Sequence, residues 1–381
     1  MDESAVVCPP ALAGPVVLHP FRALHLAADR VGSAAGARAF ASPHGRVPQR
    51  LAGWLREGLA VEEDTPAVWV HEYTARGMTV RGVVGALDLS RQAVPGATPA
   101  VLPHERVLPA QVDELERRMH QMQLQPAAIL LAHRAGPQQR SLVDRVVAGE
   151  PDLEVDDPSG QRHRAWAVTD PGTADELARC LAGTQALIAD GHHRYAAYLR
   201  LCAEHGADGP WGRGLAMLVD HDDTPLFLGA IHRLLRGASV ADLVDRARTH
   251  GLDVRTGSRA QALEALDRQV LVVADRRDAA WIRVPADRLP VELLHHDLLP
   301  ALAGAGLPSP AVDHLHTADQ ALSGADNAAG TAVLLPALEL DEVMRVLRAG
   351  RLLPEKATSF QPKPSVGVLM RPVRDGVDDR T

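Results

Sequence analysis

Aromatic residues and cysteines are both scarce in this chain. Phe, Trp and Tyr together make up 3% of the 381 residues, so Ala, Val and Leu must build the hydrophobic core, for which the 46% hydrophobic content is ample. The three cysteines, Cys8, Cys180 and Cys202, are widely spaced and odd in number. Neither a zinc site nor a disulfide framework follows from that spacing, so we expect a reduced, cytoplasmic protein.

Long apolar runs and an excess of positive charge are also missing. No stretch reaches the roughly 18 apolar residues of a membrane span, and no basic region followed by a long apolar one marks a signal peptide. The formal net charge is −8, which argues against nonspecific nucleic-acid binding because that needs a basic surface. We therefore expect neither a membrane nor a nucleic acid as a partner.

Lysine is nearly absent, since only two of the 40 basic residues are lysines and the other 38 are arginines. Both of them, Lys356 and Lys363, lie in the segment PEKATSFQPKP. The ammonium group of lysine is a compact charge that fits against a phosphoryl group without the bulk of a guanidinium. We favour a role in a phosphate site over chance placement.

Familiar nucleotide and metal motifs are not present either. The chain has no Walker P-loop, no dinucleotide-binding glycine fingerprint and no Gly-x-Ser-x-Gly elbow. Two histidine clusters occur, one at His295 and His296 and the other at His314 and His316, but neither has the spacing of a zinc enzyme. No metal site is expected at these four histidines, and their role stays open.

The most informative segment that is present is IADGHHRY, which begins at Ile188. The apolar run 186–189 predicts a short buried strand, and Asp190 and Gly191 form a turn dipeptide. Residues 192–205 have the composition of a helix. The pattern therefore predicts a strand, a tight turn and a helix in direct succession.

Three side chains that can bind anions, His192, His193 and Arg194, fall in the first turn of that helix. A helix N-terminus offers free N–H groups and a partial positive charge, and the planar guanidinium of arginine suits phosphate. We predict a phosphate-binding strand–turn–helix. The alternative is a solvated helix start with chance histidines.

The remaining pattern predicts an α/β protein in three regions, namely an N-terminal α+β region at 1–100, a core at 101–235 and a C-terminal α/β region at 236–381. Residues 95–103 are expected to be a linker. Helices are expected at 47–57, 109–125, 139–148, 173–182, 239–250, 259–267, 290–303, 317–323 and 339–349. Strands are expected at 67–73, 79–87, 127–132, 152–156, 162–168, 214–219, 226–231, 269–275, 280–284, 311–315, 331–335 and 366–370. The first two strands would be joined at Arg76 and Gly77, and the tail after residue 374 is expected to be disordered.

Two short motifs together resemble a known fold. Pro103-His104-Glu105, followed by a helix and a strand, and the later Asp-Gly-His-His-Arg box are similar to the ParB/sulfiredoxin-like fold, and most to its branch of free-serine kinases. The resemblance implies a ParB/sulfiredoxin-like core with an insertion, flanked by N-terminal and C-terminal extensions. It also implies that Glu105 is the catalytic base and that the box holds nucleotide phosphates.

Nearly the whole chain resembles the family called domain of unknown function 1015. The segment Pro20–Leu24, the Glu105 segment, the ADGHHRY box and the ending LPEKATSFQPKPSVG occur in the order typical of that family. The ending has Ala357 where members have serine, and the early Pro-Pro-Tyr-Asp segment of the family is missing, with SPHG at 42–45 standing nearby instead. The resemblance implies a link with serine metabolism, and the two departures suggest altered substrate recognition.

The candidate site residues take the following roles. Glu105 would accept the hydroxyl proton of the acceptor, or else begin the following helix as a favourable charge. Asp190 would hold the substrate amine, bind Mg²⁺ through water, or shape the turn. The phosphates are assigned to Gly191, His192, His193 and Arg194, although His193 could instead face the core.

Lys356, Thr358 and Lys363 would close over the nucleotide or the substrate carboxylate, unless Thr358 merely caps a turn. The sequence thus predicts a phosphotransferase that uses ATP or ADP with Mg²⁺ to phosphorylate serine or a similar small hydroxy amino acid. One alternative is a regulatory switch that binds CTP or ATP with little turnover, and another is an enzyme for a larger biosynthetic intermediate. The oligomeric state stays open.

Overall fold

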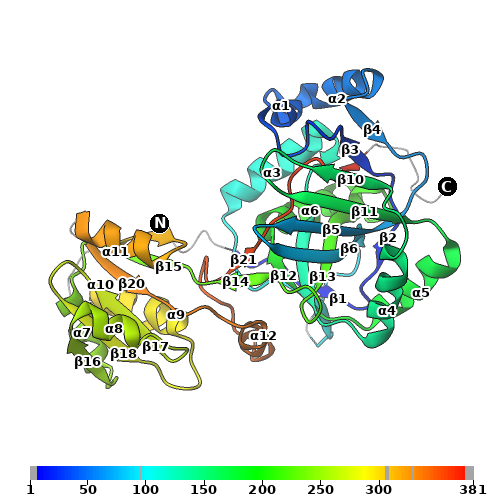
Figure 1. The fold of residues 1–381 in the computed structure, drawn as a ribbon. Coiled ribbons are helices and arrows are strands. Elements are labelled where there is room, and N and C mark those ends of the chain that lie inside the picture. The colour runs from blue at the N-terminus through cyan, green and yellow to red at the C-terminus, as the bar shows by residue number, and fades with distance from the viewer. Residues whose placement is uncertain (1–6, 95, 305–308, 328–329, 374–381) are drawn as a thin grey trace. The chain divides into compact units, whose positions relative to one another are not determined.

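The computed structural model describes residues 7–94, 96–304, 309–327 and 330–373 (Figure 1). Contacts group the chain into two compact units, the first made of Met1–Leu226 and Pro362–Thr381 and the second of Phe227–Gln361. The division at residues 100 and 235 into three sequence regions stays a prediction that these contacts do not decide. The expected disordered tail lies outside the described residues.

The first unit is built on a large mixed sheet, in which the strand order is β1-β7-β12-β9-β13-β6-β5-β11-β10 and β2 pairs with β6. Its neighbours β9 and β13 are parallel, as are β7 and β12, and the other pairs are antiparallel. The strands are β1 Leu12–Ala13, β2 Leu18–His19, β5 Val68–Ala75, β6 Met78–Asp88, β7 Pro99–Leu102, β9 Ile129–His133, β10 Leu153–Asp156, β11 Arg162–Val168, β12 Ala186–Asp190 and β13 Arg213–Asp220.

The β5–β6 hairpin forms where the sequence predicts it. Its two-residue turn has positive φ at both Arg76 (51°) and Gly77 (78°), as a type I′ turn requires to match the twist of the strands. Residues alternate between faces along β5, so Val70 packs with Val143 and Val146 on one face. His71 and Tyr73 lie on the opposite face.

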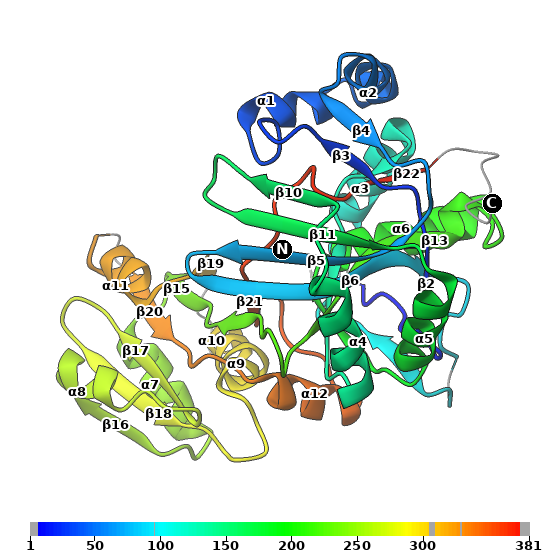
Figure 2. The ribbon, with the colours of Figure 1, turned by 45° about the vertical axis from the view of Figure 1, so that its right-hand side comes forward.

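Helices cover both faces of this sheet, which explains why its central strands are almost wholly apolar. On one face α4 Pro137–Val147 and α5 Pro171–Ala182 lie over β5 and β11 (Figure 1). On the other, α6 His192–His205 packs on β9 and β13 with α3 Pro109–Met122 beside it (Figure 2). Each of these helices was expected from the sequence.

Small outer elements complete the first unit. The antiparallel strands β3 Leu24–Leu26 and β4 Ala60–Glu62 pair with each other, and the chain between them forms α1 Ala34–Ala37 and α2 Val47–Arg56. Close to the end of the chain, β22 Arg371–Pro372 pairs with β8 Leu124–Gln125.

Two sequence predictions are wrong in this unit. The expected linker at 95–103 contains β7, because Val101 and Leu102 pair with β12 and are buried in the sheet. The expected strand at 366–370 is instead an irregular segment, because Gly367 turns it at φ +100°. Only Met370 bridges there, to Leu24.

The second unit is built on an antiparallel sheet in the order β16-β18-β17-β20-β15-β19. A short pair, β14 with β21, lies apart from it. The strands are β14 Phe227–Gly229, β15 His232–Arg236, β16 Val254–Gly257, β17 Val270–Ala274, β18 Ala279–Arg283, β19 Ala311–Leu315, β20 Gly330–Leu334 and β21 Ser359–Gln361. Of these, β15, β16 and β21 were not predicted from the sequence.

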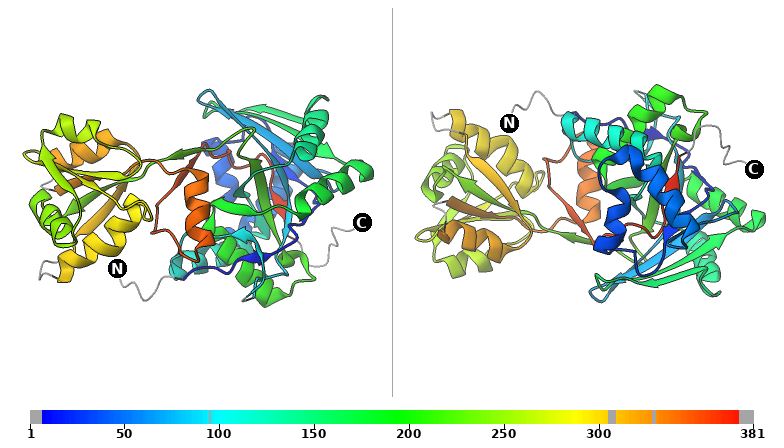
Figure 3. Two further views of the ribbon diagram at one scale, coloured as in Figure 1. Left: turned by 90° about the horizontal axis from the view of Figure 1, so that it is seen from below. Right: turned by 90° about the horizontal axis from the view of Figure 1, so that it is seen from above.

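Helices pack on both faces of the second sheet (Figure 3). The face that carries Val272 and Ala332 forms a core with Ala262 and Ala325, which lie on α8 and α11. The helices are α7 Val240–Thr249, α8 Arg259–Glu264, α9 Pro290–Leu293, the π-helical turn η5 Leu294–Leu298, α10 Leu299–Gly304, α11 Ala318–Asn327 and α12 Leu340–Arg348. In neither unit does any helix of the described ranges have the length and apolar character needed to cross a membrane.

Candidate functional site

The ADGHHRY box forms the strand, turn and helix that the sequence predicts. Strand β12 ends at Asp190, and α6 begins at His192. Gly191 between them has φ +95°, and a Cβ at this position would lie 2.9 Å from Cγ2 of Ile129. Only glycine fits this turn, because a side chain would meet both the left-handed backbone and the neighbouring strand.

The segment that carries Glu105 is hydrogen-bonded to the start of α6. The backbone N–H of His104 donates to Nε2 of His192 at 3.3 Å, and the N–H of Leu108 donates to Nε2 of His193 at 3.1 Å. The two motifs singled out in the sequence therefore lie together, and the paired histidines of the box make the connection.

These hydrogen bonds fix the protonation of the two rings. A nitrogen that accepts from a backbone N–H carries no proton, so both rings are neutral when these bonds are made. Burial, and after it the adjacent His104, lower the pKa of His192 to about 3. The more buried of the two is His192, whereas the sequence analysis had His193 as the candidate for the core. Their contribution to phosphate binding stays a prediction, with neutral rings.

Glu105 lies in the loop between β7 and α3, not at the start of a helix. The helix begins at Pro109, so the alternative role for Glu105 as a helix-terminal charge is wrong. Its Oε1 is 3.6 Å from Nε2 of His104, and its side chain is 16% exposed. The ring of His104 meets that of His192 edge-on, with 4.5 Å between the centroids. The carboxylate therefore stands beside the first turn of α6 and is accessible to solvent.

His104 was not among the predicted site residues, although it stands between Pro103 and Glu105 in the motif. Its ring is fully buried, and its backbone N–H makes one of the two bonds to the box. Its position within this motif is the signal that could have identified it.

Arg194, whose side chain is 22% exposed, holds the turn together. Its Nη1 donates to the carbonyl oxygens of Ala127 at 3.1 Å and Ala128 at 2.7 Å, and its Nη2 donates to Oδ2 of Asp190 at 2.5 Å. The guanidinium thus ties the end of β12 to the chain that enters β9. Its predicted binding of phosphate is not tested by these contacts and stays a prediction.

Asp190 also pairs with Lys363, which comes from the far end of the sequence. The carboxylate of Asp190 is 21% exposed and the Lys363 side chain 49% exposed. The first unit therefore brings together Glu105, Asp190 and Lys363 with the start of α6.

The other two residues expected to close over the nucleotide or the substrate carboxylate, Lys356 and Thr358, belong to the second unit. Lys356 has φ +50°, which is unusual for a residue with a side chain. Its carbonyl oxygen accepts a hydrogen bond from Nη2 of the buried Arg233 at 3.0 Å. Their part in nucleotide binding stays a prediction.

Within the described ranges, no group of three or more His, Cys, Asp or Glu side chains is arranged to hold a metal ion. His295, one of the histidines considered earlier, accepts from Nε of Arg233 at 3.1 Å.

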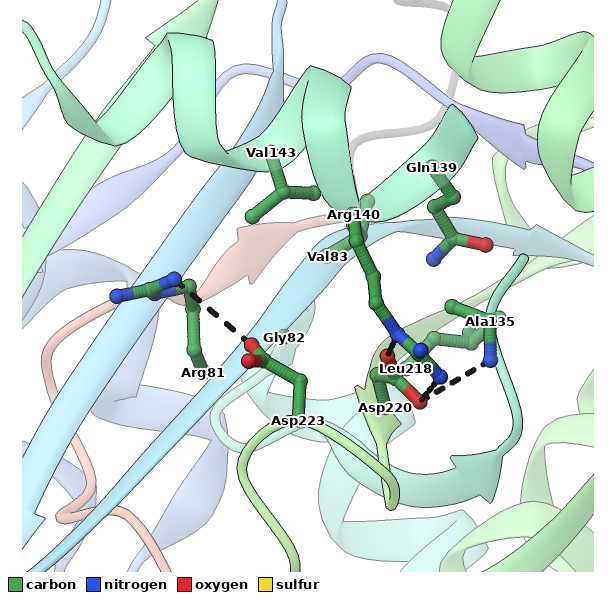
Figure 4. Close-up of a pocket in the computed structure, with 10 residues that line it drawn as sticks. All are labelled: Arg81, Gly82, Val83, Ala135, Gln139, Arg140, Val143, Leu218, Asp220 and Asp223. Atoms are coloured by element: carbon green, nitrogen blue, oxygen red, sulfur yellow. Dashed lines mark hydrogen bonds and ion pairs between the residues drawn. The ribbon is translucent and has the colours of Figure 1, made fainter. Parts of the chain in front are cut away.

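A shallow pocket lies elsewhere in the first unit, at the carboxyl ends of the parallel strands β9 and β13 (Figure 4). The two arginines that line it are already paired. Nε of Arg140 donates to Oδ2 of Asp220 at 2.6 Å, and Arg81 lies 3.8 Å from Asp223. The residues lining it include none of the predicted site residues, so the phosphate site proposed from the sequence is at a different place.

Comparison of this mixed α/β protein with known proteins identifies its family. The model of a family described as "Protein of unknown function (DUF1015)" matches residues 13–294, and the chain belongs to that family. A search of curated proteins finds no match.

Several solved structures have a weakly similar fold. A free serine kinase variant in complex with AMP has 15% identity and a TM-score of 0.41, over 71% of this chain and 88% of that chain. A conserved hypothetical protein from Pyrococcus furiosus has 15% identity and a TM-score of 0.40, over 71% and 92%. SbnI with a C-terminal truncation, from Staphylococcus aureus, has 10% identity and a TM-score of 0.41, over 75% and 87%. These likenesses are weak.

Proposed function

We propose that this protein is a cytoplasmic phosphotransferase that moves a phosphoryl group from ATP or ADP to the hydroxyl of serine or a similar small hydroxy amino acid. One observation carries the proposal. The N–H groups of His104 and Leu108 bind the first two residues of α6, and this joins a candidate base, Glu105, to a helix N-terminus.

Phosphoryl transfer needs an anion site, a cation and a proton acceptor near one another. The N–H groups at the start of α6 would bind phosphate oxygens, and Lys363 would supply positive charge. The acceptor oxygen attacks the terminal phosphorus, the bond to the bridging oxygen breaks, and the shortened nucleotide leaves. The hydroxyl proton passes to Glu105.

Two other residues would orient the reactants. Asp190 would hold the ammonium group of the amino acid or a water molecule bound to Mg²⁺. When bound with the nucleotide, Mg²⁺ would offset the phosphate charge. Arg194 would keep the turn in shape through its bonds to Ala127 and Ala128.

The test is a direct search for product. Purified protein is incubated with Mg²⁺, with ATP or ADP, and with a panel of small hydroxy amino acids and larger hydroxylated amino acids, and products are identified by mass spectrometry. The proposal expects a phosphorylated acceptor from the small members of the panel. Nucleotide binding without any phosphorylated acceptor would contradict it and favour the switch that binds CTP or ATP. Transfer to a larger acceptor alone would contradict the proposed substrate class.

A further inference from the structure

The segment Pro362–Ser365, here called the strap, lies in the first unit and carries Lys363. Tyr73 holds its first residue, because the phenol of Tyr73 donates to the carbonyl oxygen of Pro362 at 2.7 Å. Tyr73 is completely buried. Burial raises the pKa of its phenol and the charge of Asp190 raises it further, so Asp190 is close enough to act on this side chain electrostatically. The phenol stays a hydrogen-bond donor at physiological pH.

Asp157 holds the other end of the strap. Its Oδ2 accepts from the hydroxyl of Ser365, and its Oδ1 accepts from the backbone N–H groups of Ser159 at 2.8 Å and Gln161 at 2.9 Å. Burial alone would raise the pKa of this carboxyl, but the hydrogen bonds, that of Ser365 above all, outweigh it and hold the pKa below its usual value.

The space around this carboxylate is filled. Gly32 has φ +63°, and a Cβ there would lie 2.6 Å from Oδ2 of Asp157 and 3.2 Å from the hydroxyl of Ser365. The Asp157–Ser365 contact is therefore enclosed by the N-terminal part of the chain.

Between these two anchors, the middle of the strap is fixed as well. The side-chain amide of Gln161 donates to the carbonyl oxygen of Lys363 at 3.1 Å. The ammonium group of Lys363 pairs with Asp190, but a half-exposed ion pair contributes only about 0–1 kcal/mol. The ion pair is too weak to order the strap by itself, so its order comes from the hydrogen bond of Gln161 and from the buried side chains of Tyr73 and Asp157.

We propose that Tyr73 and Asp157 are positioning residues that fix the strap, so that the ammonium group of Lys363 is delivered to the Asp190–Gly191 turn as a ligand for nucleotide phosphate. The choice of phosphate as the ligand rests on the proposed function. A lysine side chain loses about 2 kcal/mol of rotamer entropy when it is immobilised, and a fixed backbone confines that loss to the side chain.

The scarcity of lysine makes this testable. Reductive methylation with ¹³C-formaldehyde labels Lys356, Lys363 and the N-terminal amine, and keeps their charge. The variants Lys356→Arg and Lys363→Arg assign the two lysine signals in the NMR spectrum. We expect Tyr73→Phe and Ser365→Ala each to move the Lys363 signal towards that of an unstructured lysine, with the Lys356 signal unchanged.

Tyr195→Phe is the matched control, because the phenol of Tyr195 is equally buried and donates to the carbonyl oxygen of Pro10 at 2.7 Å. It should leave the Lys363 signal in place. If Tyr73→Phe and Ser365→Ala, folded by circular dichroism, both leave the Lys363 signal at its wild-type position, the strap proposal is wrong.

A second measurement tests whether the anchoring of the strap affects the affinity for nucleotide. Calorimetric titration with ADP should show Tyr73→Phe raising the dissociation constant about fivefold, as expected for one lost hydrogen bond. In a Lys363→Ala background the same substitution should have almost no further effect, because it acts through that lysine. Equal effects in both backgrounds would overturn the positioning role. A wild type that binds neither ATP nor ADP would instead refute the proposed function, while the methyl signals without nucleotide still decide whether the strap is anchored.

Discussion

The backbone N–H of His104 donates a hydrogen bond to Nε2 of His192 at 3.3 Å, across 88 residues of sequence. Because a protonated Nε2 could not accept this bond, the contact requires a neutral ring. The loop that presents Glu105 is thus held by a side chain whose protonation would release it. The connection between the two motifs is therefore sensitive to acid.

For this reason the free energy of unfolding should decrease as the pH is lowered. The pKa of His192 is about 3 in the folded protein and about 6.5 in an unfolded chain, so between these values the unfolded chain binds one more proton. The contribution of His192 to the free energy of unfolding is fully present above pH 6.5 and is lost as the pH falls towards 3. From pH 7 to 5 the loss is about 2 kcal/mol.

Urea unfolding at pH 7 and pH 5 measures this effect. His192→Gln, which keeps an acceptor, should lose about 2 kcal/mol less than the wild type over this interval. The exposed His316→Gln serves as the control and should follow the wild type. Equal losses for His192→Gln and the wild type would mean that His192 titrates normally.

Gly191→Ala should destabilise the protein. The left-handed backbone costs an alanine about 1–2 kcal/mol, and the new Cβ would lie 2.9 Å from Ile129. Gly183→Ala is the matched control, since Gly183 has φ −89° and no atom within 4 Å of the added Cβ. Thermal unfolding should show a clear loss for Gly191→Ala and none for Gly183→Ala, and similar melting temperatures for both would contradict the strained turn.

Arg194→Lys should also lower stability, although the charge is kept. A lysine can pair with Asp190, but it cannot at the same time donate to the carbonyl oxygens of Ala127 and Ala128. We expect a loss of about 1–2 kcal/mol in the free energy of unfolding, measured in urea, whereas the exposed Arg179→Lys should change it little. An unchanged Arg194→Lys would show that the guanidinium does not hold the turn.

Local patterns in the sequence predicted much of the fold. The box at 188–195 and the hairpin at Arg76 and Gly77 were predictable, because a glycine turn between an apolar run and a helical composition is decided by neighbours in sequence. The family could also be identified from motifs spread along the chain.

Contacts between distant residues could not be predicted in the same way. Strand β7 looks like a linker because it is short, and only its pairing with β1 and β12, both distant in sequence, makes it a strand. The two lysines lie within eight residues, yet Lys363 pairs with Asp190 in the first unit and Lys356 belongs to the second. Composition marked both lysines, but only the fold separates them.

The most direct test of the central claim is to compare catalysis with binding in Glu105→Gln. If Glu105 accepts the hydroxyl proton, turnover should fall by about 100-fold or more, while the dissociation constant for ADP stays within about twofold of the wild type. The exposed Glu150→Gln is the control and should behave as the wild type does. Turnover that survives in Glu105→Gln, or a loss of ADP binding that matches the loss of turnover, would contradict the assignment of Glu105 as the base.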